Sequence, residues 1–463
     1  MGGIDTSPKK KPGRPPKAKF RPWFVFVAAF LGWSFFILIV ADGRYAGDIR
    51  GFLCLGEYTP HPGALAAAPK TSRDGYDGQF YAALATDPFM RNHETVAAMD
   101  NPAFRGSRLM IPLLAWILSL GNAGVAVYIY QFLCWTLGIA AVVLVARMLG
   151  EDGRCPAWAL ILILSGGLAA SLIRTTPDAA TVAFILAALW FHRRGRFGAA
   201  LGFVMAAVLS REIAAIVALG LAVAELRERK FLRSVAFVAA PAAVWLGWKV
   251  YMQIWLGTAF TAGENIFGSL FSWVVRKIGE IIYGFVGSPS MEIAGLLALA
   301  ASLVGLAAVA SQKSRWTAPE YTFLGFSVLI PLMSYSVYIE AWGYTRILIV
   351  LPFLAILVAE RQKSAWRRWS LRSVAIAYTI VGVIMLTGEL RAAIRGRSLG
   401  RATIDAVSHL VKPSSRPRQE RRPPVRMDAS LPALLAPIPT DPVSEPPGNR
   451  AHRDRIPEFI DRY

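Results

Sequence analysis

Long apolar runs constrain this chain more than any other feature. Windows of roughly 17–25 mostly apolar residues recur along it, the length that crosses about 30 Å of hydrocarbon as a helix. Of its 463 residues, 55% are hydrophobic and only 17% are charged, which is too apolar a balance for a soluble protein of this length. Backbone amides in lipid must be paired within the segment, so the spans are helices. The sequence predicts an all-α polytopic membrane protein.

The first run, residues 23–41, is too long for a signal-peptide core and lacks a small-residue cleavage site, so we expect it to remain as a transmembrane helix. A large loop follows over residues 42–122, and its short apolar segment at 108–121 predicts an interfacial or half-inserted helix. A transmembrane domain over 123–390 brings the total to about eleven spans. The pair of runs at 197–226 predicts either one broken helix or a re-entrant hairpin. The further spans are expected near 123–147, 156–173, 179–191, 197–209, 212–226, 234–256, 291–310, 322–339, 346–360 and 373–388.

Basic residues are distributed unequally between the two sides of these spans. Alternate threading places most of them on the side of the N-terminus. The opposite short loops hold only Arg174, Arg211, Arg276, Lys277 and Arg346. This positive-inside pattern predicts a cytoplasmic N-terminus and an extracytoplasmic first loop. It also accounts for the basic segment 1–22, whose KKKPGRPPKAK string is similar to a minor-groove AT-hook, so we expect no nucleic-acid partner.

The C-terminal segment 391–463 differs from the rest of the chain. It is rich in Pro and Arg and has no apolar periodicity. Such a composition predicts a disordered tail. Its basic residues favour contact with anionic membrane lipids.

The sequence lacks the motifs of common soluble enzymes and metal sites. The three cysteines, Cys54, Cys134 and Cys155, are too scattered for a disulfide framework or a zinc site. The sequence has five histidines without ligand spacing and no Gly-rich phosphate loop or GxSxG element. An extracytoplasmic enzyme without a nucleotide module must take its activated substrate from the membrane. A lipid-linked sugar phosphate meets that requirement.

The first loop carries the residues that membrane insertion does not explain. The stretch SRDGYDGQFYAALATDPF, residues 72–89, holds Asp74, Asp77 and Asp87 among glycines and aromatics. Carboxylates held at a bilayer surface are costly to desolvate, which indicates chemistry or ion binding. Sugar transfer needs a carboxylate to deprotonate the acceptor hydroxyl and cations to stabilise the departing phosphate.

Three segments resemble the GT-C superfamily of membrane glycosyltransferases, which use polyprenyl-phosphate-linked sugars. YDGQFYAALA (76–85) is similar to the W-D-G-x-x-Y-x-x-I-A type of motif of the GPI-mannosyltransferase-like branch, with Tyr76 where that branch usually has Trp. RGSRLMIPLLAWILSLG (105–121) is similar to the Arg-then-Pro-Leu segment that follows it, and RTTPDAATVAFILAAL (174–189) to a later outward-facing Asp-Ala. The resemblance implies transfer from a polyprenyl-phosphate donor to a glycan, lipid or protein acceptor of the cell envelope, in a bacterial inner membrane.

The resemblance places Asp77 at the family's loop aspartate and implies that it is the general base. Its alternative is an ordinary Asp-Gly turn. Asp74 is a candidate to share this role or to bind a divalent cation, and an equally good candidate for a helix N-cap. We expect Asp87 and Asp100, each close to a proline, to mark turns or helix ends.

Several charged or aromatic residues near the expected outer ends of spans are candidates to bind the substrate or its phosphate. Arg105 and Arg108 suit bidentate phosphate contact, or they extend to lipid head groups. Arg174 and Asp178 lie on either side of Pro177 at a span end, and they predict a pair, either with each other or directed at the substrate, or a polar helix cap. The full set of substrate-binding candidates is Arg105, Arg108, Arg174, Asp178, Arg211, Glu212, Lys249, Arg346 and Tyr81.

Two other classes stay open on the sequence alone. A transporter or flippase of lipid-linked glycans is also many-spanning, but such proteins often show inverted repeats, and we find no repeat here. A non-catalytic subunit of a surface-polysaccharide assembly complex is the other class.

Overall fold

The computed structural model describes residues 21–257, 267–312 and 316–411. The described residues up to Leu399 belong to one compact unit, and the described residues from Gly400 on belong to a second. Helices dominate the described part, and the one sheet there pairs β1 (Leu55–Gly56) with β2 (Lys70–Ser72) in parallel. The predicted all-α class is confirmed.

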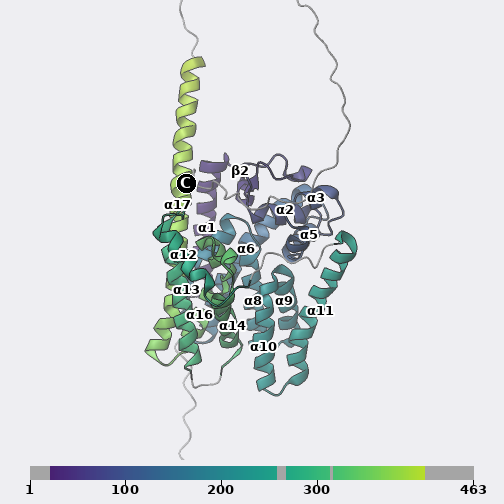
Figure 1. Cartoon of the computed structure of the whole chain (residues 1–463), viewed down its shortest axis with the longest axis vertical. Coiled ribbons are helices and arrows are strands. Elements are labelled where there is room, and N and C mark those ends of the chain that lie inside the picture. The colour runs from purple at the N-terminus through teal and green to yellow at the C-terminus, as the bar shows by residue number, and fades with distance from the viewer. Residues whose placement is uncertain (1–20, 258–266, 313–315, 412–463) are drawn as a thin grey trace, which may run out of the picture. The chain divides into compact units, whose positions relative to one another are not determined.

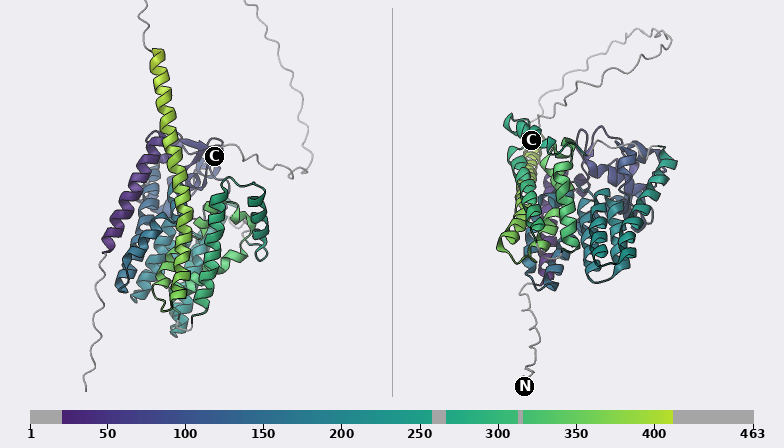
Figure 2. Two further views of the ribbon diagram at one scale, coloured as in Figure 1. Left: turned by 90° about the vertical axis from the view of Figure 1, so that its left-hand side faces the viewer. Right: turned by 60° about the horizontal axis from the view of Figure 1, so that its bottom comes forward.

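Helices long and apolar enough to cross a membrane form the frame of the first unit (Figures 1 and 2). Five single helices meet this requirement in the described residues, and two bent pairs raise the number to seven. The bent pairs are η3 (Pro156–Leu164) with α7 (Gly166–Ile173), at 53°, and α15 (Ala341–Ile347) with α16 (Val350–Ala359), at 55°. The five are α1 (Pro22–Tyr45), α6 (Ala123–Glu151), α11 (Phe231–Leu256), α13 (Pro289–Ala310) and the segment Ala365–Gly396 of α17 (Ala365–Val411).

The total of about eleven spans stays a prediction. Four of the predicted spans correspond to shorter helices, each of 16 residues or fewer: α8 (Asp178–Arg193), α9 (Phe197–Ser210), α10 (Ala215–Arg227) and α14 (Ala318–Leu332). Helices of this length are common in buried cores as well as in half-inserted segments, so length does not decide where they lie.

The break between η3 and α7 has its own hydrogen-bond partners. Trp33 of α1 donates from Nε1 to the carbonyl of Ile163 at 3.2 Å, and Thr379 of α17 donates to that of Ile161 at 2.8 Å. A side chain at Gly382 of α17 would overlap the Leu164 carbonyl, so a glycine is needed there for α17 to lie against the break. Neighbouring helices thus pair the backbone groups that the bend releases, as buried backbone requires.

Helices α9 and α10 form a hairpin. Phe197 at the start of α9 and Glu225 near the end of α10 line the same cavity, so the two helices run in opposite directions. Arg211 and the short helix η4 (Glu212–Ala214) form the tip. The antiparallel arrangement excludes a single broken helix, and the re-entrant position of the hairpin in a membrane stays a prediction.

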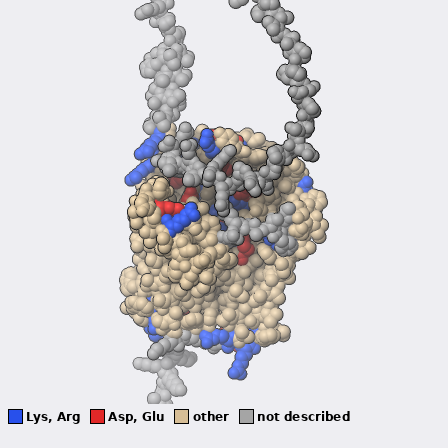
Figure 3. All heavy atoms as spheres, viewed as in Figure 1, with Lys and Arg blue, Asp and Glu red and all other residues tan. Residues whose placement is uncertain are grey.

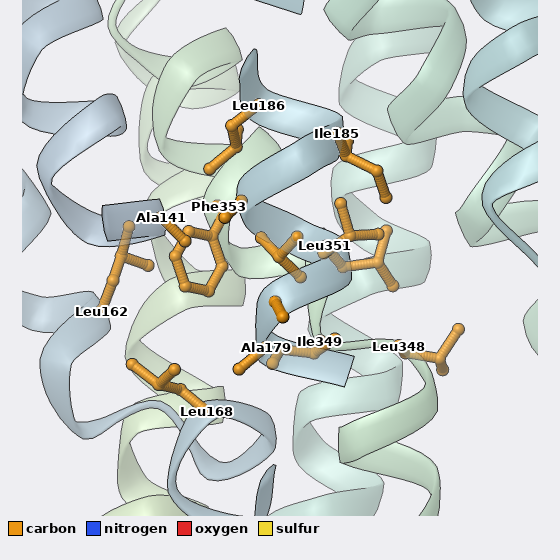
Figure 4. Packing of buried hydrophobic residues seen from close by; sticks show 14 of the residues in the cluster. Ala141, Leu162, Leu168, Ala179, Ile185, Leu186, Leu348, Ile349, Leu351 and Phe353 are labelled. Carbon is orange, nitrogen blue, oxygen red and sulfur yellow. The ribbon is translucent and has the colours of Figure 1, made fainter. Parts of the chain in front are cut away.

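The core lies around α8 and α16, which are buried along nearly their whole length. Figure 4 shows Ile185 and Leu186 of α8 near Phe353 of α16 and Ala141 of α6. A helix that is apolar all round is buried on all sides. By contrast, α1 exposes large apolar side chains, among them Phe35 at 67%, as expected for a helix that faces lipid.

The first loop folds into short elements at the end where α1 stops, which we call the loop end (Figure 1, top). The predicted short apolar segment contains α5 (Met110–Leu118), and its depth in a membrane stays a prediction. The other helices of this loop are η1 (Ile49–Leu53), η2 (Gly63–Leu65), α2 (Asp77–Thr86), α3 (His93–Ala97) and α4 (Pro102–Arg105). Beyond the hairpin, the chain adds α12 (Ser272–Ile282) and η5 (Tyr335–Tyr338).

The prediction of a disordered tail from residue 391 was wrong for its first part. Helix α17 continues to Val411. Residues 391–411 contain many good helix formers and no proline, and Pro413 is the first proline after the transmembrane part. The remainder of the predicted tail and the basic segment 1–20 lie outside the described residues.

Candidate functional site

Asp77 is the first residue of α2, at the loop end. Tyr76 before it is extended, and Gly75 takes a φ of +75°, which glycine adopts without strain. A side chain at Gly78 would overlap the carbonyl of Arg174, so this glycine lets the first turn of α2 pack against the chain before α8. The alternative of an isolated Asp-Gly turn is wrong, because Asp77 begins a helix. A carboxylate at a helix N-terminus is stabilised by the helix dipole.

Two arginines from distant segments hold the Asp77 carboxylate. Arg105 Nη1 lies 2.9 Å from Oδ1, and Arg346 Nη2 lies 2.6 Å from Oδ2. Burial opposes ionisation, but the charges of Arg346, Arg105 and Arg108 outweigh it and hold the pKa of Asp77 well below its usual range. The Asp77 side chain keeps 16% exposure, so it is not fully enclosed by the protein.

Asp178, the first residue of α8, extends this array of charges. Its side chain is 2% exposed and forms an ion pair with Arg211 at the tip of the hairpin. Its Oδ2 lies 3.5 Å from Arg346 Nε. The order Arg105–Asp77–Arg346–Asp178–Arg211 therefore alternates in sign and joins four separate parts of the chain. The predicted pair of Arg174 with Asp178 does not form.

Arg108 lies beside this row of charges. It donates to the Tyr81 hydroxyl, and its Nη2 lies 3.3 Å from Glu212 Oε1. Glu212 keeps 33% exposure, whereas Arg108 is almost fully buried. The tip of the hairpin thus supplies both Arg211 and Glu212 to the site, as expected for a charged pair placed between two apolar runs.

Arg174 belongs to a neighbouring group of aromatic and charged residues that the sequence did not indicate. Its guanidinium lies 4.2 Å from the ring centroid of Trp342, and its Nη2 lies 3.8 Å from Glu389 of α17. Trp342 stacks on Tyr76 with centroids 5.0 Å apart. Burial raises the pKa of Tyr76 to about 12, so its phenol is neutral at physiological pH. The only signal in the sequence for Glu389 is a single acidic residue at the end of an apolar run.

The remaining candidate residues form contacts that stabilise the local structure. Tyr81 is fully buried, so its ring cannot stack on a sugar as predicted; it orients Arg108 instead. Lys249 donates from Nζ to the carbonyl of Ala103 at 3.1 Å and so fixes the loop. Asp87 ends α2 and accepts from the Asn92 N–H at 2.7 Å, which confirms the predicted helix stop. Asp100 forms a bidentate pair with Arg105.

Asp74 lies apart from these charges. Its side chain is exposed, and it is not the N-cap of α2, a position that Tyr76 occupies, so that alternative is wrong. Within the described ranges, no group of three or more His, Cys, Asp or Glu residues has the arrangement to hold a metal ion. The predicted roles of Asp74 as a second base or as a ligand of a divalent cation stay predictions.

Buried donors in the site retain unused hydrogen-bonding capacity. Arg346 Nη1 and Arg108 Nε are buried and have no hydrogen-bond partner among the described residues. Four guanidinium groups, of Arg105, Arg108, Arg211 and Arg346, surround the carboxylates of Asp77, Asp178 and Glu212, with Asp100 at the rim. Buried donors of this kind are suited to the oxygens of a phosphate, which arginine binds in a planar, bidentate manner.

Comparison of the chain with protein-family models, with curated proteins and with solved structures finds no match.

Proposed function

We propose that the protein is a GT-C-type membrane glycosyltransferase that moves a sugar from a polyprenyl-phosphate donor to an acceptor of the cell envelope. The observation that carries this proposal is the position of Asp77. A partly exposed carboxylate lies among buried arginines that come from the loop, the hairpin tip and α15. Transfer assays with lipid-linked and nucleotide-linked sugars test it directly.

The charged residues have different roles in the transfer step. The acceptor hydroxyl oxygen forms a bond to the anomeric carbon of the sugar, and the bond from that carbon to the phosphate oxygen breaks. Asp77 takes the hydroxyl proton, and polyprenyl phosphate leaves with the electron pair of the broken bond. Arg346 and Arg105 stabilise the negative charge that develops on the phosphate. Asp178 positions Arg346 and Arg211 for this contact.

The arginines also couple base strength to donor binding. With both oxygens paired to guanidinium groups, Asp77 is a weak base in the free protein. A donor phosphate adds negative charge beside Asp77 and draws Arg346 and Arg105 toward itself. Both effects raise the pKa of Asp77, so the carboxylate becomes a better base when the donor is bound.

This coupling predicts two different acid limits. The acid limb of kcat/KM reports the free enzyme, and that of kcat reports the enzyme with substrates bound. The pKa of free Asp77 lies below the usual carboxyl value of about 4, so kcat/KM should stay level as the pH falls to about that value. The fall of kcat on the acid side should begin at a higher pH than the fall of kcat/KM. Steady-state rates across pH 4–8 measure both, and identical limbs would contradict the coupling.

The proposal places the loop end outside the cytoplasm of a bacterial cell, with the N-terminus inside. Cys155 is the one exposed cysteine among the described residues and lies at the opposite end, whereas Cys54 and Cys134 are buried. Tyr58 in the first loop is 68% exposed. A membrane-impermeant maleimide should label Tyr58→Cys, in a Cys155→Ser background, in intact spheroplasts. Native Cys155 should be labelled only after permeabilisation. The reverse pattern would overturn the orientation and the outer-leaflet donor with it.

A further inference from the structure

A cavity of about 830 Å³ lies at the end opposite to Asp77, where α8 and α10 end and α14 begins. We call this the basic end; Figure 3 shows Lys and Arg side chains gathered there, at the bottom of the view. Asp178 and Arg193 mark the two ends of α8, whose 16 residues span about 24 Å. The cavity is therefore separate from the candidate transfer site, and none of the charged residues around Asp77 lines it.

Arginines and lysine line much of this cavity, and their charges are unequally neutralised. Arg193 lies 2.6 Å from Asp152, Lys230 lies 2.6 Å from Glu228, and Arg361 lies 3.5 Å from Asp152. Two others line the cavity without such a partner. In the part of the chain that the structure describes, neither guanidinium has a hydrogen bond or an ion pair, and that of Arg233 lies 5.4 Å from the ring centroid of Phe197. These two side chains are exposed and free to bind an anion.

The wall of the cavity also offers a buried acceptor. Glu225 is 4% exposed, and its Oε1 lies 2.8 Å from His192 Nε2. Its Oε2 is buried and accepts no hydrogen bond from the described residues, although Lys230 Nζ lies 4.0 Å away. A carboxylate oxygen in this state favours a ligand that carries a hydrogen-bond donor as well as an anionic group.

The surroundings of the cavity indicate where such a ligand comes from. Leu226 of α10 and Phe231 and Leu232 of α11, next in sequence to cavity residues, are 51%, 65% and 83% exposed. Apolar side chains this exposed on membrane helices suit acyl chains. Basic pockets between transmembrane helices, close to the aqueous boundary, bind lipid head groups.

We propose that this cavity binds the head group of an anionic phospholipid. The phosphodiester contacts Arg154 and Arg233, and a head-group hydroxyl, such as those of a glycerol head group, donates to Glu225 Oε2. The acyl chains lie along the apolar faces of α10 and α11. This site is independent of sugar transfer, so either proposal can fail while the other stands.

The test is a lipid titration of the purified full-length protein in detergent, read by native mass spectrometry. The wild type should bind phosphatidylglycerol more tightly than phosphatidylcholine or soluble glycerol phosphate. The double variant Arg154→Gln with Arg233→Gln should bind phosphatidylglycerol about tenfold more weakly, since each basic residue near a lipid surface contributes attraction. Its melting temperature should change little, because neither side chain forms an ion pair in the described residues and the variant loses only the contact of Arg233 with the Phe197 ring.

A matched control separates the cavity from general surface charge. Arg196 and Arg229 lie at the same end, are exposed and do not line the cavity. The double variant Arg196→Gln with Arg229→Gln makes the same change in net charge and should bind phosphatidylglycerol as the wild type does. Equal weakening in both double variants would overturn the proposal. Glycerol phosphate binding as tight as that of phosphatidylglycerol would also overturn it and would assign the cavity to a soluble phosphate.

Discussion

Asp77→Asn is expected to lower sugar transfer by a factor of about 100 or more, the usual contribution of a positioned general base. The amide keeps the size of the carboxylate and its oxygen still accepts from Arg105 or Arg346, but it cannot take the acceptor proton. The measurement is the initial rate of transfer from a lipid-linked sugar in membrane vesicles, normalised to the amount of inserted protein. We expect that amount to stay close to wild type, because Asp77 is partly exposed and Arg105 keeps its pair with Asp100.

Two other aspartates of the same loop serve as controls for this result. Asp87 only accepts a backbone hydrogen bond at the end of α2, so Asp87→Asn should have a mild effect on transfer. Asp74 is exposed and lies outside the charged row, so Asp74→Asn should also be mild if Asp77 is the base. Near-normal activity of Asp77→Asn together with loss of activity in Asp74→Asn would show that Asp74, and not Asp77, is the base.

Asp178→Ala is expected to be the most destabilising single change in the site, by about 3–5 kcal/mol of unfolding free energy. Its carboxylate is 2% exposed and faces both Arg211 and Arg346, so its removal leaves the buried guanidinium of Arg211 without its ion-pair partner and leaves Arg346 paired with Asp77 alone. The loss should appear as a large drop in the melting temperature of the detergent-purified protein. Asp74→Ala, which changes an exposed side chain, should move stability by no more than about 0.5 kcal/mol.

A second substitution tests the cause of this loss. Adding Arg211→Met to Asp178→Ala removes the guanidinium that lost its ion-pair partner, so the double variant should recover part of the stability lost by the single variant. A single variant that melts like the wild type would contradict the assignment of Asp178 as the partner of these arginines. A double variant less stable than the single one would show that Arg211 contributes to stability through other contacts.

The class of fold could be predicted from the sequence because apolar length and backbone pairing leave few choices in a membrane. The lengths of the apolar runs also placed the break at Arg211, and the proline that follows Asp87 indicated the helix end there. The prediction from the sequence was wrong for residues 391–411, where the basic composition obscured a run of helix formers without proline. It was also wrong for Tyr81, because an aromatic residue in a loop motif gives no sign of whether its ring is buried.

The candidate site could be predicted only in part. Each charged residue could be identified on its own in the sequence, because a charge is unusual beside apolar helices. Which of them meet was not predictable, because Asp77 and Arg346 are 269 residues apart and no periodicity relates them. Arg174 shows the same limit: it contacts Trp342 and Glu389 rather than Asp178, which is close to it in sequence.

Transfer by the purified protein from a defined donor is the most direct test of the central claim, that the row of charges around Asp77 and Arg346 acts on a lipid-linked sugar phosphate. A panel of polyprenyl-phosphate sugars, presented in vesicles with envelope glycan acceptors, should give a glycosidic product with at least one donor. The Arg346→Ala variant should use that donor less well, by roughly 1.5–3 kcal/mol of lost phosphate binding. Efficient transfer from a water-soluble nucleotide sugar, with no lipid carrier present, would contradict the account. Net movement of the lipid-linked sugar across the vesicle membrane without any glycosidic product would contradict it as well and would indicate a transporter.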